Sequence, residues 1–435
     1  MKDARPLLSL DEALSLLVAG STPYAITQTE TVSTFDALGR VLAADVLSGL
    51  DVPPEDNTSM DGYVLRAADV PVAGTLLPVA QRIPAGHVGE PLRPGTAARI
   101  FTGGQVPAGG DAVVMQEQCE AVPAGLDESG MGRVRVNSVP TVGQWIRRRG
   151  EDVQRGAAVL QRGQRLTPQA LGLAASVGAA TLTVLRRPRV ALFSTGDELQ
   201  NPGEVLRPGA IYNSNRYTLR ALAQAAGCEV IDLGIVGDTF DATRAALREA
   251  ARVSDLIVTC GGVSVGEEDH LKPAARAEGE LDDWQIAIKP GKPLAFGRVR
   301  KADGEKGEKY ENGQSGEKCA CAALLVGLPG NPVSAFITFL LAVGPVLRAM
   351  QGMPSAPLAS MPMRADFDWP RPDRRREFLR VQLNAGGGLS LFANQSSGVL
   401  TSVVWADGLV DNPGSQAIAQ GDTVRFVPLA WLVSR

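Results

Sequence analysis

Histidine and aromatic residues are scarce in this chain, and its cysteines do not suggest a metal site. Of 435 residues, only two are histidine, and aromatic residues make up 5%. His87 and His270 lie far apart in the sequence, so the chain indicates neither a histidine-based zinc site nor a Ser-His-Asp triad. The five cysteines include no CxxC pair, which argues against a four-cysteine zinc site and a disulfide framework. They are typical of reduced thiols, and we expect a cytoplasmic protein.

An excess of positive charge is also absent. Lysine and arginine number 43 against 47 acidic residues, which gives a formal net charge of -4. Two short basic runs, 147–149 and 374–376, lack interleaved aromatic residues. A nucleic-acid-binding surface usually combines a basic field with aromatic residues on which bases stack. We therefore expect no nucleic-acid partner, and any anionic ligand must be bound by local groups.

The sequence contains no long hydrophobic run. The most apolar stretch, 333–347, spans 15 residues and is interrupted by Ser, Thr, Gly and Pro. It is too short for a transmembrane helix, which needs roughly 20 apolar residues. The first residues carry an acidic side chain at position 3 and lack the apolar core of a signal peptide. We expect a protein with no membrane partner.

Glycine and proline are abundant, numbering 48 and 29, which is typical of a chain rich in turns. Ser9 and Glu12 form a capping box ahead of an apolar pattern, which predicts a helix near the start. Thr167 and Pro168 predict a second helix that ends near Gly178. Short strand-like pieces lie between them, over 51–140. This order predicts a β domain inserted between helical segments.

The region 187–352 has the pattern of a doubly wound α/β domain. Four apolar runs rich in Val, Leu and Ile suit strands buried on both faces of a parallel sheet, and they read RVALFST, EVIDLGIV, DLIVTCGG and AALLVGLPG. Helical patterns alternate with them, so ligands are expected at the carboxyl ends of the strands. The polar stretch 301–318 reads as a mobile surface loop. Residues 353–435 return to strand-like alternation, which predicts a C-terminal β domain.

Three segments place polar and glycine residues directly after predicted strands. They read FSTGDEL, TCGGVSVGEEDH and LPGNPVSAF, and their candidate ligand-binding residues are Thr195, Gly196, Gly261, Gly262, Ser264, Gly266, Gly330 and Asn331. Glycines let backbone amides approach an anion, and the neighbouring acids can hold a divalent cation. Each segment alone also fits an ordinary turn or helix start. Because strand ends of one sheet converge, the three together predict an anionic ligand beside a metal ion.

Further candidates lie outside these three segments. IKPGKP contributes Lys289 and Lys292, which suit phosphate or molybdate oxygens but also fit two surface lysines. The segments PPEDNTSMDGYVLR and RRRGEDV gather charged and amide groups, and both also fit solvated turns. With histidine so scarce, we expect the chemistry to depend on carboxylates and a metal ion.

Seven motifs occur in a fixed order: DNTSMDGY, RIFTGGQVPAGGDAVVMQE, IRRRGEDV, ALFSTGDEL, CGGVSVGEED, IKPGKPLAFG and LPGNPVSAF. On these motifs the chain closely resembles, over nearly its whole length, the MoeA-type molybdopterin molybdenumtransferases, which are bacterial relatives of the gephyrin E domain. The resemblance implies a multidomain α/β protein with four domains. These are a split helical domain (1–50 plus 141–186), an inserted β domain (51–140), a molybdopterin-binding α/β domain (187–352) and a C-terminal β domain (353–435).

The resemblance also implies a reaction and an assembly. Proteins of this family join molybdate to adenylylated molybdopterin in the presence of Mg²⁺, and they release AMP and molybdenum cofactor. The implied assembly is a homodimer with its site between the α/β domain of one subunit and the inserted domain of the other. A molybdopterin adenylyltransferase and factors that mature molybdoenzymes are possible further partners.

The resemblance implies roles for individual residues, which are assigned by their positions in the matching motifs. Asp61 and Thr102 are the contributions of the inserted domain, and Lys289 and Lys292 face oxyanion oxygens. The acids implied for catalysis are Glu198, Asp238 and Asp269, of which Glu198 and Asp269 are the expected metal ligands. Pro329 and Pro332 shape the pterin-binding turn, and Asp152 and Ser397 are additional candidates. No residue is assigned as a general base.

The chain departs from the family pattern at three places. Gln285 stands where relatives can carry a lysine, His270 stands where tyrosine is common, and the 301–318 loop is long.

Two other functions share parts of this pattern. A MogA-like adenylyltransferase uses the same α/β domain but lacks the flanking β domains and the DNTSMDGY block. A gephyrin-like scaffold would be expected to carry a long linker or a fused domain.

Overall fold

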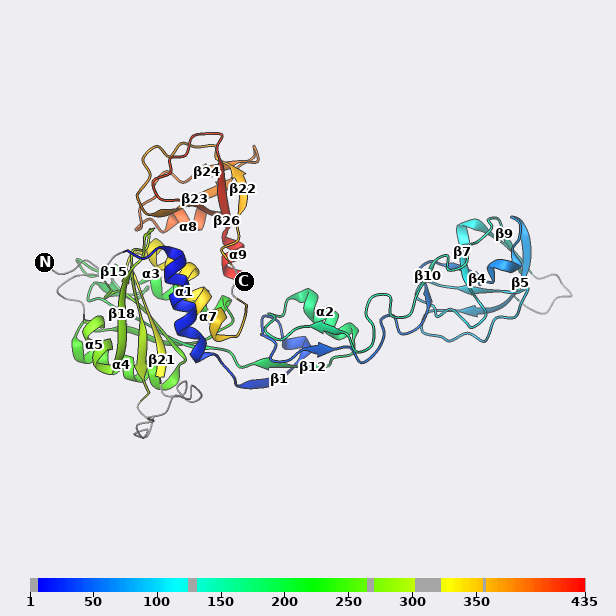
Figure 1. Cartoon of the computed structure of the whole chain (residues 1–435), viewed down its shortest axis with the longest axis horizontal. Coiled ribbons are helices and arrows are strands. Elements are labelled where there is room, and N and C mark those ends of the chain that lie inside the picture. The colour runs from blue at the N-terminus through cyan, green and yellow to red at the C-terminus, as the bar shows by residue number, and fades with distance from the viewer. Residues whose placement is uncertain (1–6, 124–130, 264–269, 302–321, 355–356, 435) are drawn as a thin grey trace. The chain divides into compact units, whose positions relative to one another are not determined.

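The computed structural model describes residues 7–123, 131–263, 270–301, 322–354 and 357–434 (Figure 1). It divides into two compact units. The larger comprises Met1–Glu30, Gly39–Val41 and Val184–Arg435, and the smaller comprises Thr31–Leu38 and Leu42–Thr183. The chain passes between the units in the strands β1 (Thr29–Ser33) and β12 (Thr181–Leu185), and also on either side of Gly39–Val41. Each unit is described by itself below.

A six-stranded mixed sheet forms the centre of the larger unit, in the order β16-β13-β17-β21-β20-β18. Its four parallel strands coincide with the four predicted apolar runs: β13 (Arg189–Thr195), β16 (Glu229–Val236), β17 (Leu256–Cys260) and β21 (Ala322–Leu328). Two antiparallel strands extend the sheet, β20 (Pro293–Arg300) and β18 (Gly279–Gln285). The predicted doubly wound α/β fold is confirmed.

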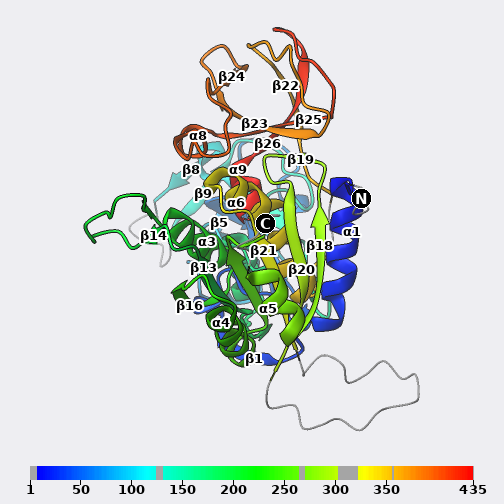
Figure 2. The ribbon, with the colours of Figure 1, turned by 90° about the vertical axis from the view of Figure 1, so that its left-hand side faces the viewer.

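Helices cover both faces of this sheet. On one face, α3 (Ser214–Ala225) and the helical segment that follows β21 pack in the same core as Val190 and Val258. On the other face, α4 (Phe240–Val253) and α5 (Leu271–Glu278) lie side by side (Figure 1, Figure 2). Leu247 and Leu271 are their fully buried contacts with the sheet. The central strands β13, β17 and β21 are therefore buried on both faces, which explains why they are continuously apolar.

The predicted first helix is confirmed as α1 (Leu10–Ser21). The Ser9 amide donates to Glu12 Oε2 over 2.8 Å, and the Glu12 amide donates to Ser9 Oγ over 3.2 Å, so the capping box is complete. Its buried residues Leu10 and Leu17 belong to the core of the α/β sheet. The first helix thus packs against the core of the α/β sheet. The predicted domain boundaries themselves remain a prediction.

The apolar segment after β21 is longer than the sequence suggested. It forms one helical stretch from α6 (Pro332–Thr338) through a π-helical turn (Phe339–Val343) to α7 (Gly344–Met350). Its 19 residues are long and apolar enough to cross a membrane by length and composition, but 72% of its most apolar window is buried in the protein. The helix continues through Gly344 and Pro345, the residues that interrupt its apolar pattern. This segment is the central core helix of the larger unit.

A second six-stranded sheet completes the larger unit, in the order β19-β23-β25-β26-β22, with β24 paired to β23. Its C-terminal strands are β22 (Met361–Arg364), β23 (Arg376–Leu383), β24 (Leu389–Leu391), β25 (Gly408–Asn412) and β26 (Thr423–Pro428). The short helices α8 (Thr401–Trp405) and α9 (Leu429–Ser434) follow β24 and β26. The edge strand β19 (Ile288–Lys289) comes from the α/β region, so this sheet joins two parts of the chain.

The smaller unit contains the predicted inserted β domain. Its six-stranded sheet has the order β7-β4-β6-β5-β9-β8, with strands β4 (Gly62–Leu65), β5 (Thr75–Ile83), β6 (Ala97–Ile100), β7 (Ala112–Met115), β8 (Cys119–Val122) and β9 (Arg133–Val136). Two further ladders pair β3 (Asn57–Thr58) with β10 (Ile146–Arg147) and β2 (Val46–Leu47) with β11 (Ala158–Leu160). The predicted second helix is confirmed as α2 (Pro168–Ser176), capped by Thr167.

Short elements fill the connections. The 3-10 turns are Thr22–Tyr24, Thr34–Asp36, Ala67–Asp69 and Gln116–Gln118. In the larger unit, β14 (Leu199–Gln200) pairs with β15 (Ile211–Tyr212) directly after the FSTGDEL segment. This pair brings the chain from the end of β13 to the start of α3, where the candidate site lies.

Candidate functional site

Loops from three adjacent parallel strands meet at one edge of the larger unit's sheet. β13, β17 and β21 end at Thr195, Cys260 and Leu328. A Cβ atom on Gly261 would lie 2.6 Å from the Thr195 carbonyl oxygen, and the Gly261 amide donates to the Leu328 carbonyl over 3.2 Å. Gly261 also has a φ of +97°, which favours glycine. Glycine thus allows the loop after β17 to touch the end of β13. The three segments lie close together at this edge, as the sequence predicts.

Asn215, in the first turn of α3, joins the second and third loops. Its Nδ2 donates to the Gly330 carbonyl over 2.6 Å and to Cys260 Sγ over 3.0 Å, and the Cys260 thiol donates to the Pro329 carbonyl over 3.3 Å. Burial raises the pKa of the Cys260 thiol to about 12, so it remains a neutral donor. Asn215 was not among the predicted site residues. The sequence signal that could have indicated Asn215 is its position at the start of a helix that begins at this edge of the sheet.

The LPGNP turn lies next to the C-terminal domain. Pro329 is buried, Gly330 and Asn331 are exposed, and Pro332 is the first residue of α6. The amide of Val333 donates to the Ser397 carbonyl over 3.0 Å. The predicted candidates Pro329, Asn331 and Ser397 are therefore brought into one region. The Asn331 side chain does not cap the helix and faces solvent.

Acidic side chains gather beside the first loop. The Glu198 side chain is exposed and folds back over Gly196, where a Cβ atom would lie 2.5 Å from Glu198 Oε2. The amide of Asp238, which follows β16, donates to Asp197 Oδ1 over 3.4 Å. Asp197 thus connects two predicted acids, although it was not itself predicted. Gly262 has a φ of +65° in the second loop. The candidates Ser264, Gly266 and Asp269 lie outside the described residues.

The donor chemistry of this edge is compatible with Mg²⁺. Within the described ranges, no three His, Cys, Asp or Glu side chains are close enough to hold a metal ion together. Mg²⁺ usually binds one or two carboxylates and completes its shell with water and substrate phosphates. The exposed carboxylate of Glu198 is an oxygen donor of that kind, and the Asp197 carboxylate, which accepts the Asp238 amide, is another. The residues present therefore fit Mg²⁺.

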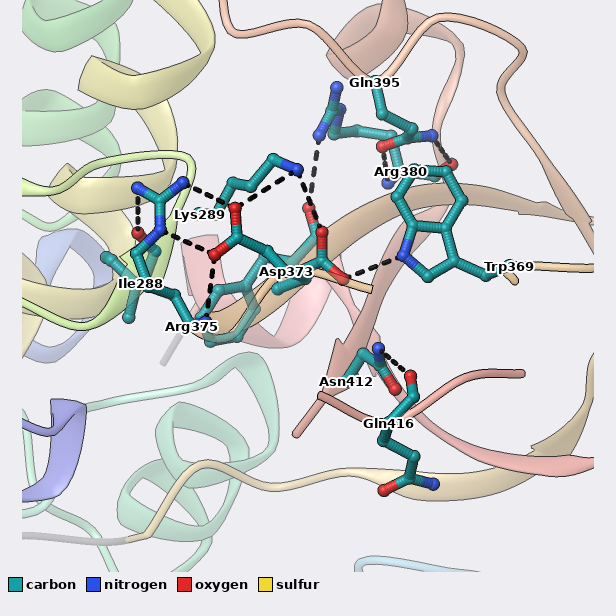
Figure 3. Close-up of polar contacts among 11 residues, drawn as sticks. Ile288, Lys289, Trp369, Asp373, Arg375, Arg380, Gln395, Asn412 and Gln416 are labelled. Carbon is teal, nitrogen blue, oxygen red and sulfur yellow. Dashed lines mark hydrogen bonds and ion pairs between the residues drawn. The ribbon is translucent and has the colours of Figure 1, made fainter. Parts of the chain in front are cut away.

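The two predicted lysines have different surroundings. Lys289 Nζ lies 3.2 Å from Glu377 Oε1 and 3.6 Å from Asp373 Oδ2, and the Lys289 side chain is 40% exposed (Figure 3). Asp373 in turn accepts two hydrogen bonds from the Arg375 guanidinium, which hold the pKa of this carboxyl well below its usual range. Lys292 is exposed. Sequence reasoning did not select Asp373 or Glu377, because their contact with Lys289 depends on how two distant segments pair.

In the smaller unit, the structure brings Asp61 and Thr102 together. The amide and the hydroxyl of Thr102 both donate to Asp61 Oδ1, each over 2.7 Å. These two hydrogen bonds, with a weaker contribution from Arg99, lower the pKa of the Asp61 carboxyl. Arg99 also donates to the neighbouring Gly62 carbonyl over 2.9 Å. Asp61 therefore stays ionised and fixed in orientation at neutral pH.

The RRRGEDV segment is tied to PPEDN by ion pairs. Arg148 lies 2.6 Å from Asp56, and Arg149 lies 2.7 Å from Asp51. The candidate Asp152 has an exposed side chain, and its amide donates to the Val52 carbonyl over 2.9 Å. The second basic run is also paired, since Arg376 lies 2.6 Å from Asp411. These ion pairs fix the positions of Arg148, Arg149 and Arg376 within the protein.

Two of the three departures from the family pattern, Gln285 and His270, are described residues of the larger unit. Gln285 is half-buried at the end of β18, and its carbonyl accepts a hydrogen bond from the Leu8 amide over 2.9 Å. His270 occupies the position before α5 without a capping bond from its side chain. The expected mobile loop, apart from Lys301, lies outside the described residues.

Three family models match consecutive parts of the chain. The MoeA N-terminal region (domain I and II) matches residues 8–178. The probable molybdopterin binding domain matches residues 191–349, and the MoeA C-terminal region (domain IV) matches residues 362–429. The matched regions include both the strand-end loops and the Asp61–Thr102 pair.

Known proteins resemble the chain over most of its length. A Haemophilus influenzae protein named molybdopterin molybdenumtransferase is 40% identical over 346 residues, covering 80% of this chain and 78% of that protein. Molybdopterin molybdenumtransferase 2 of Mycobacterium tuberculosis is 37% identical over 397 residues, covering 88% and 90%. Among solved structures, a molybdopterin biosynthesis MoeA protein of Pyrococcus horikoshii is 27% identical with a TM-score of 0.75, covering 97% of this chain and 99% of that one.

Proposed function

Because the chain belongs to the MoeA family of molybdopterin molybdenumtransferases, we propose that it inserts molybdate into adenylylated molybdopterin and releases AMP and molybdenum cofactor. The observation that carries this proposal is the meeting of three glycine-containing loops at the ends of β13, β17 and β21. Ligands of doubly wound sheets bind at this edge. The product serves molybdoenzymes, so the protein acts in molybdenum cofactor biosynthesis.

The strand-end loops bind the phosphorylated pterin. Glycines at the loop tips leave room for a ligand against the backbone, and the exposed Gly330 and Asn331 are open to it. The residues assigned to this role are Thr195, Gly196, Gly261, Gly262, Ser264, Gly266, Pro329, Gly330, Asn331, Pro332 and Ser397. Asn215 supports them from α3 through its hydrogen bonds to Cys260 and Gly330.

Lys289 and Lys292 bind molybdate or phosphate oxygens. Bringing two anions together in a chain of net charge -4 costs electrostatic free energy unless cations lie close by. Lys292 is exposed, and Lys289 keeps 40% of its side chain exposed despite its two acidic neighbours. Both ammonium groups can therefore approach an oxyanion from the same proline-containing loop.

Glu198 and Asp269 are the residues that would hold Mg²⁺, and Asp238 would assist them. When bound, the ion neutralises phosphate charge and polarises a phosphoryl oxygen. The chain's own acids orient the substrate: Glu198 lies over Gly196, and Asp197 links this loop to Asp238. No residue is assigned as a general base.

Asp61 and Thr102 act on the same substrate from the inserted domain of a second subunit, so the active species is a homodimer. A fixed, ionised carboxylate such as Asp61 can accept a hydrogen bond from the pterin or help to hold a cation. Asp152 assists from the neighbouring segment. The homodimer works in the cytoplasm, and a molybdopterin adenylyltransferase supplies its substrate.

An activity assay tests this function. Purified full-length protein is given adenylylated molybdopterin, molybdate and Mg²⁺, and AMP and molybdenum cofactor are measured. We expect AMP release that depends on molybdate and that stops when Mg²⁺ is chelated. Rapid synthesis of adenylylated molybdopterin from ATP and molybdopterin without molybdate would instead identify an adenylyltransferase. Unchanged insertion by Glu198→Gln in a folded protein would contradict the assigned site.

A further inference from the structure

A buried carboxylate on β23 faces the ammonium group of Lys289 on β19. The Glu377 side chain is 1% exposed, whereas the Lys289 side chain is 40% exposed. The parallel ladder between the two strands pairs Lys289 with Glu377 directly, so the strand register sets the contact. Glu377 Oε1 accepts from Lys289 Nζ over 3.2 Å, and Oε2 accepts from Trp369 Nε1 over 2.8 Å (Figure 3).

Two carboxylates lie near Lys289, and each is hydrogen-bonded to a different cation: Glu377 to Lys289 and Asp373 to Arg375. Asp373 is engaged by Arg375, whose guanidinium donates to both of its oxygens over 3.0 and 2.8 Å. Asp373 Oδ2 is 3.6 Å from Lys289 Nζ, beyond hydrogen-bond distance. Lys289 therefore lies within ion-pair distance of both carboxylates, but its hydrogen bond goes to Glu377. A buried carboxylate needs such a partner, because its desolvation is otherwise uncompensated.

We propose that Glu377 is a positioning residue for oxyanion binding. It holds Lys289 Nζ at the buried end of the IKPGKP loop, so that the remaining N–H groups of the ammonium face the exposed side where the oxyanion arrives. The proposal rests on the proposed function, in which Lys289 binds molybdate or phosphate. Trp369 completes the arrangement, because its indole N–H fixes the second oxygen of Glu377 and thereby the orientation of the carboxylate.

The chemistry of the two contacts makes this arrangement sensitive to charge. Both Lys289 Nζ and Trp369 Nε1 are donors. A glutamine at position 377 has one acceptor oxygen and an NH₂ group that would face one of these donors. It therefore cannot satisfy both contacts, and the long, flexible lysine side chain is released from its fixed position. Loss of a fixed cation weakens oxyanion binding, which is a change in KM for molybdate more than in kcat.

A double-mutant cycle with Lys289 tests the proposal. We expect Glu377→Gln to raise the KM for molybdate about tenfold and to leave kcat within about twofold. Lys289→Met also raises this KM. If Glu377 acts through Lys289, Glu377→Gln adds nothing further in the Lys289→Met protein. Multiplicative effects of the two substitutions on KM would overturn the proposal.

Asp411 supplies the matched control. It is a carboxylate of the same sheet, 4% exposed and paired with Arg376 and Arg425, and it does not contact Lys289. Asp411→Asn should leave the KM for molybdate unchanged, and an equal rise in KM would show that Glu377 acts only through stability.

If Glu377→Gln does not fold, Trp369→Phe keeps the carboxylate and removes one restraint. A smaller rise in KM supports the proposal, and an unchanged KM contradicts it.

The outcome for Glu377 is separable from the outcome for the function. Molybdate binding is measured by calorimetry on the same four proteins of the cycle, and the dissociation constants should show the same non-additivity as KM. If the dissociation constants for molybdate are non-additive across the cycle but the wild-type protein releases no AMP, the proposed function alone is contradicted. A wild-type protein that releases AMP, with independent effects of the two substitutions, contradicts the role of Glu377 alone.

Discussion

Asp61 and Thr102 meet at a single carboxylate oxygen, although 41 positions separate them in the sequence. Oδ1 of Asp61 accepts both the amide and the hydroxyl of Thr102. In the part of the chain that the structure describes, no hydrogen bond is made to Oδ2 of Asp61. One oxygen therefore fixes the carboxylate in place, and the other is available to a ligand.

The first prediction concerns the charge of Asp61. Asp61→Asn keeps an oxygen that can accept both Thr102 donors, so the domain should fold normally. The negative charge is lost, and we expect molybdate-dependent AMP release to fall about 100-fold or more, as when a preorganised polar group is removed from an active site. Glu120→Gln, an exposed acid of the same sheet, is the control and should retain activity. Full activity of Asp61→Asn would contradict the assignment.

The second prediction concerns pH. Hydrogen bonds from Thr102 lower the pKa of Asp61, so the ionised form is present above that pKa and is lost as the pH falls through it. Thr102→Val removes the hydroxyl donor and raises this pKa towards the ordinary value. The acidic limb of kcat/KM should then move to higher pH, measured between about pH 3 and pH 7. Thr96→Val, in the same domain, should not move it.

The third prediction concerns the contact between the first two loops. Gly261→Ala places a methyl group 2.6 Å from the Thr195 carbonyl oxygen at a φ of +97°. We expect the free energy of unfolding to fall by about 2 kcal/mol or more and pterin binding to be lost. Gly209 has a φ of +79° and no atom within 4 Å of an added Cβ atom. Gly209→Ala should cost only about 1 kcal/mol.

Urea unfolding followed by tryptophan fluorescence measures this difference. Four of the five tryptophans, Trp284, Trp369, Trp405 and Trp431, lie in the larger unit that contains Gly261. An equal loss of stability in both alanine variants would mean that positive φ, and not contact with Thr195, determines the effect.

The fourth prediction concerns the start of α1. Ser9→Ala removes the side chain that accepts the Glu12 amide, and we expect a loss of about 1 kcal/mol in the free energy of unfolding of the larger unit. Ser15 lies on the same helix, and its hydroxyl donates to the Asp11 carbonyl over 2.8 Å. Ser15→Ala should therefore be neutral or slightly stabilising, because alanine favours helix. A neutral Ser9→Ala would show that core packing alone fixes α1.

Local patterns predicted the elements of this protein well. The capping box at Ser9 and Glu12, the cap at Thr167 and the four continuous apolar strands all depend on neighbouring residues, and all are present. The packing of α1 against the α/β sheet was not predicted, because an amphipathic helix does not specify its partner. The helix that follows β21 continues through Pro345, because the helical segment is held by burial on most of its surface.

The side-chain partners in the candidate site were harder to predict. Asn215, Asp197 and Glu377 each contact a predicted residue, but those contacts join segments that are brought together only by the sheets. Strand-end motifs predict which loops converge, since parallel strands share one edge. They do not predict which polar side chains occupy the space between the loops.

Hydrogen exchange on adding ligand tests the central claim most directly, namely that three strand-end loops form one binding site. Full-length protein is compared with and without AMP, Mg²⁺ and molybdate. We expect amides in 195–199, 260–263 and 330–334 to be protected together, with the turn at 384–388 in the C-terminal domain unchanged. Protection confined to one of these loops, or to none, would contradict the account.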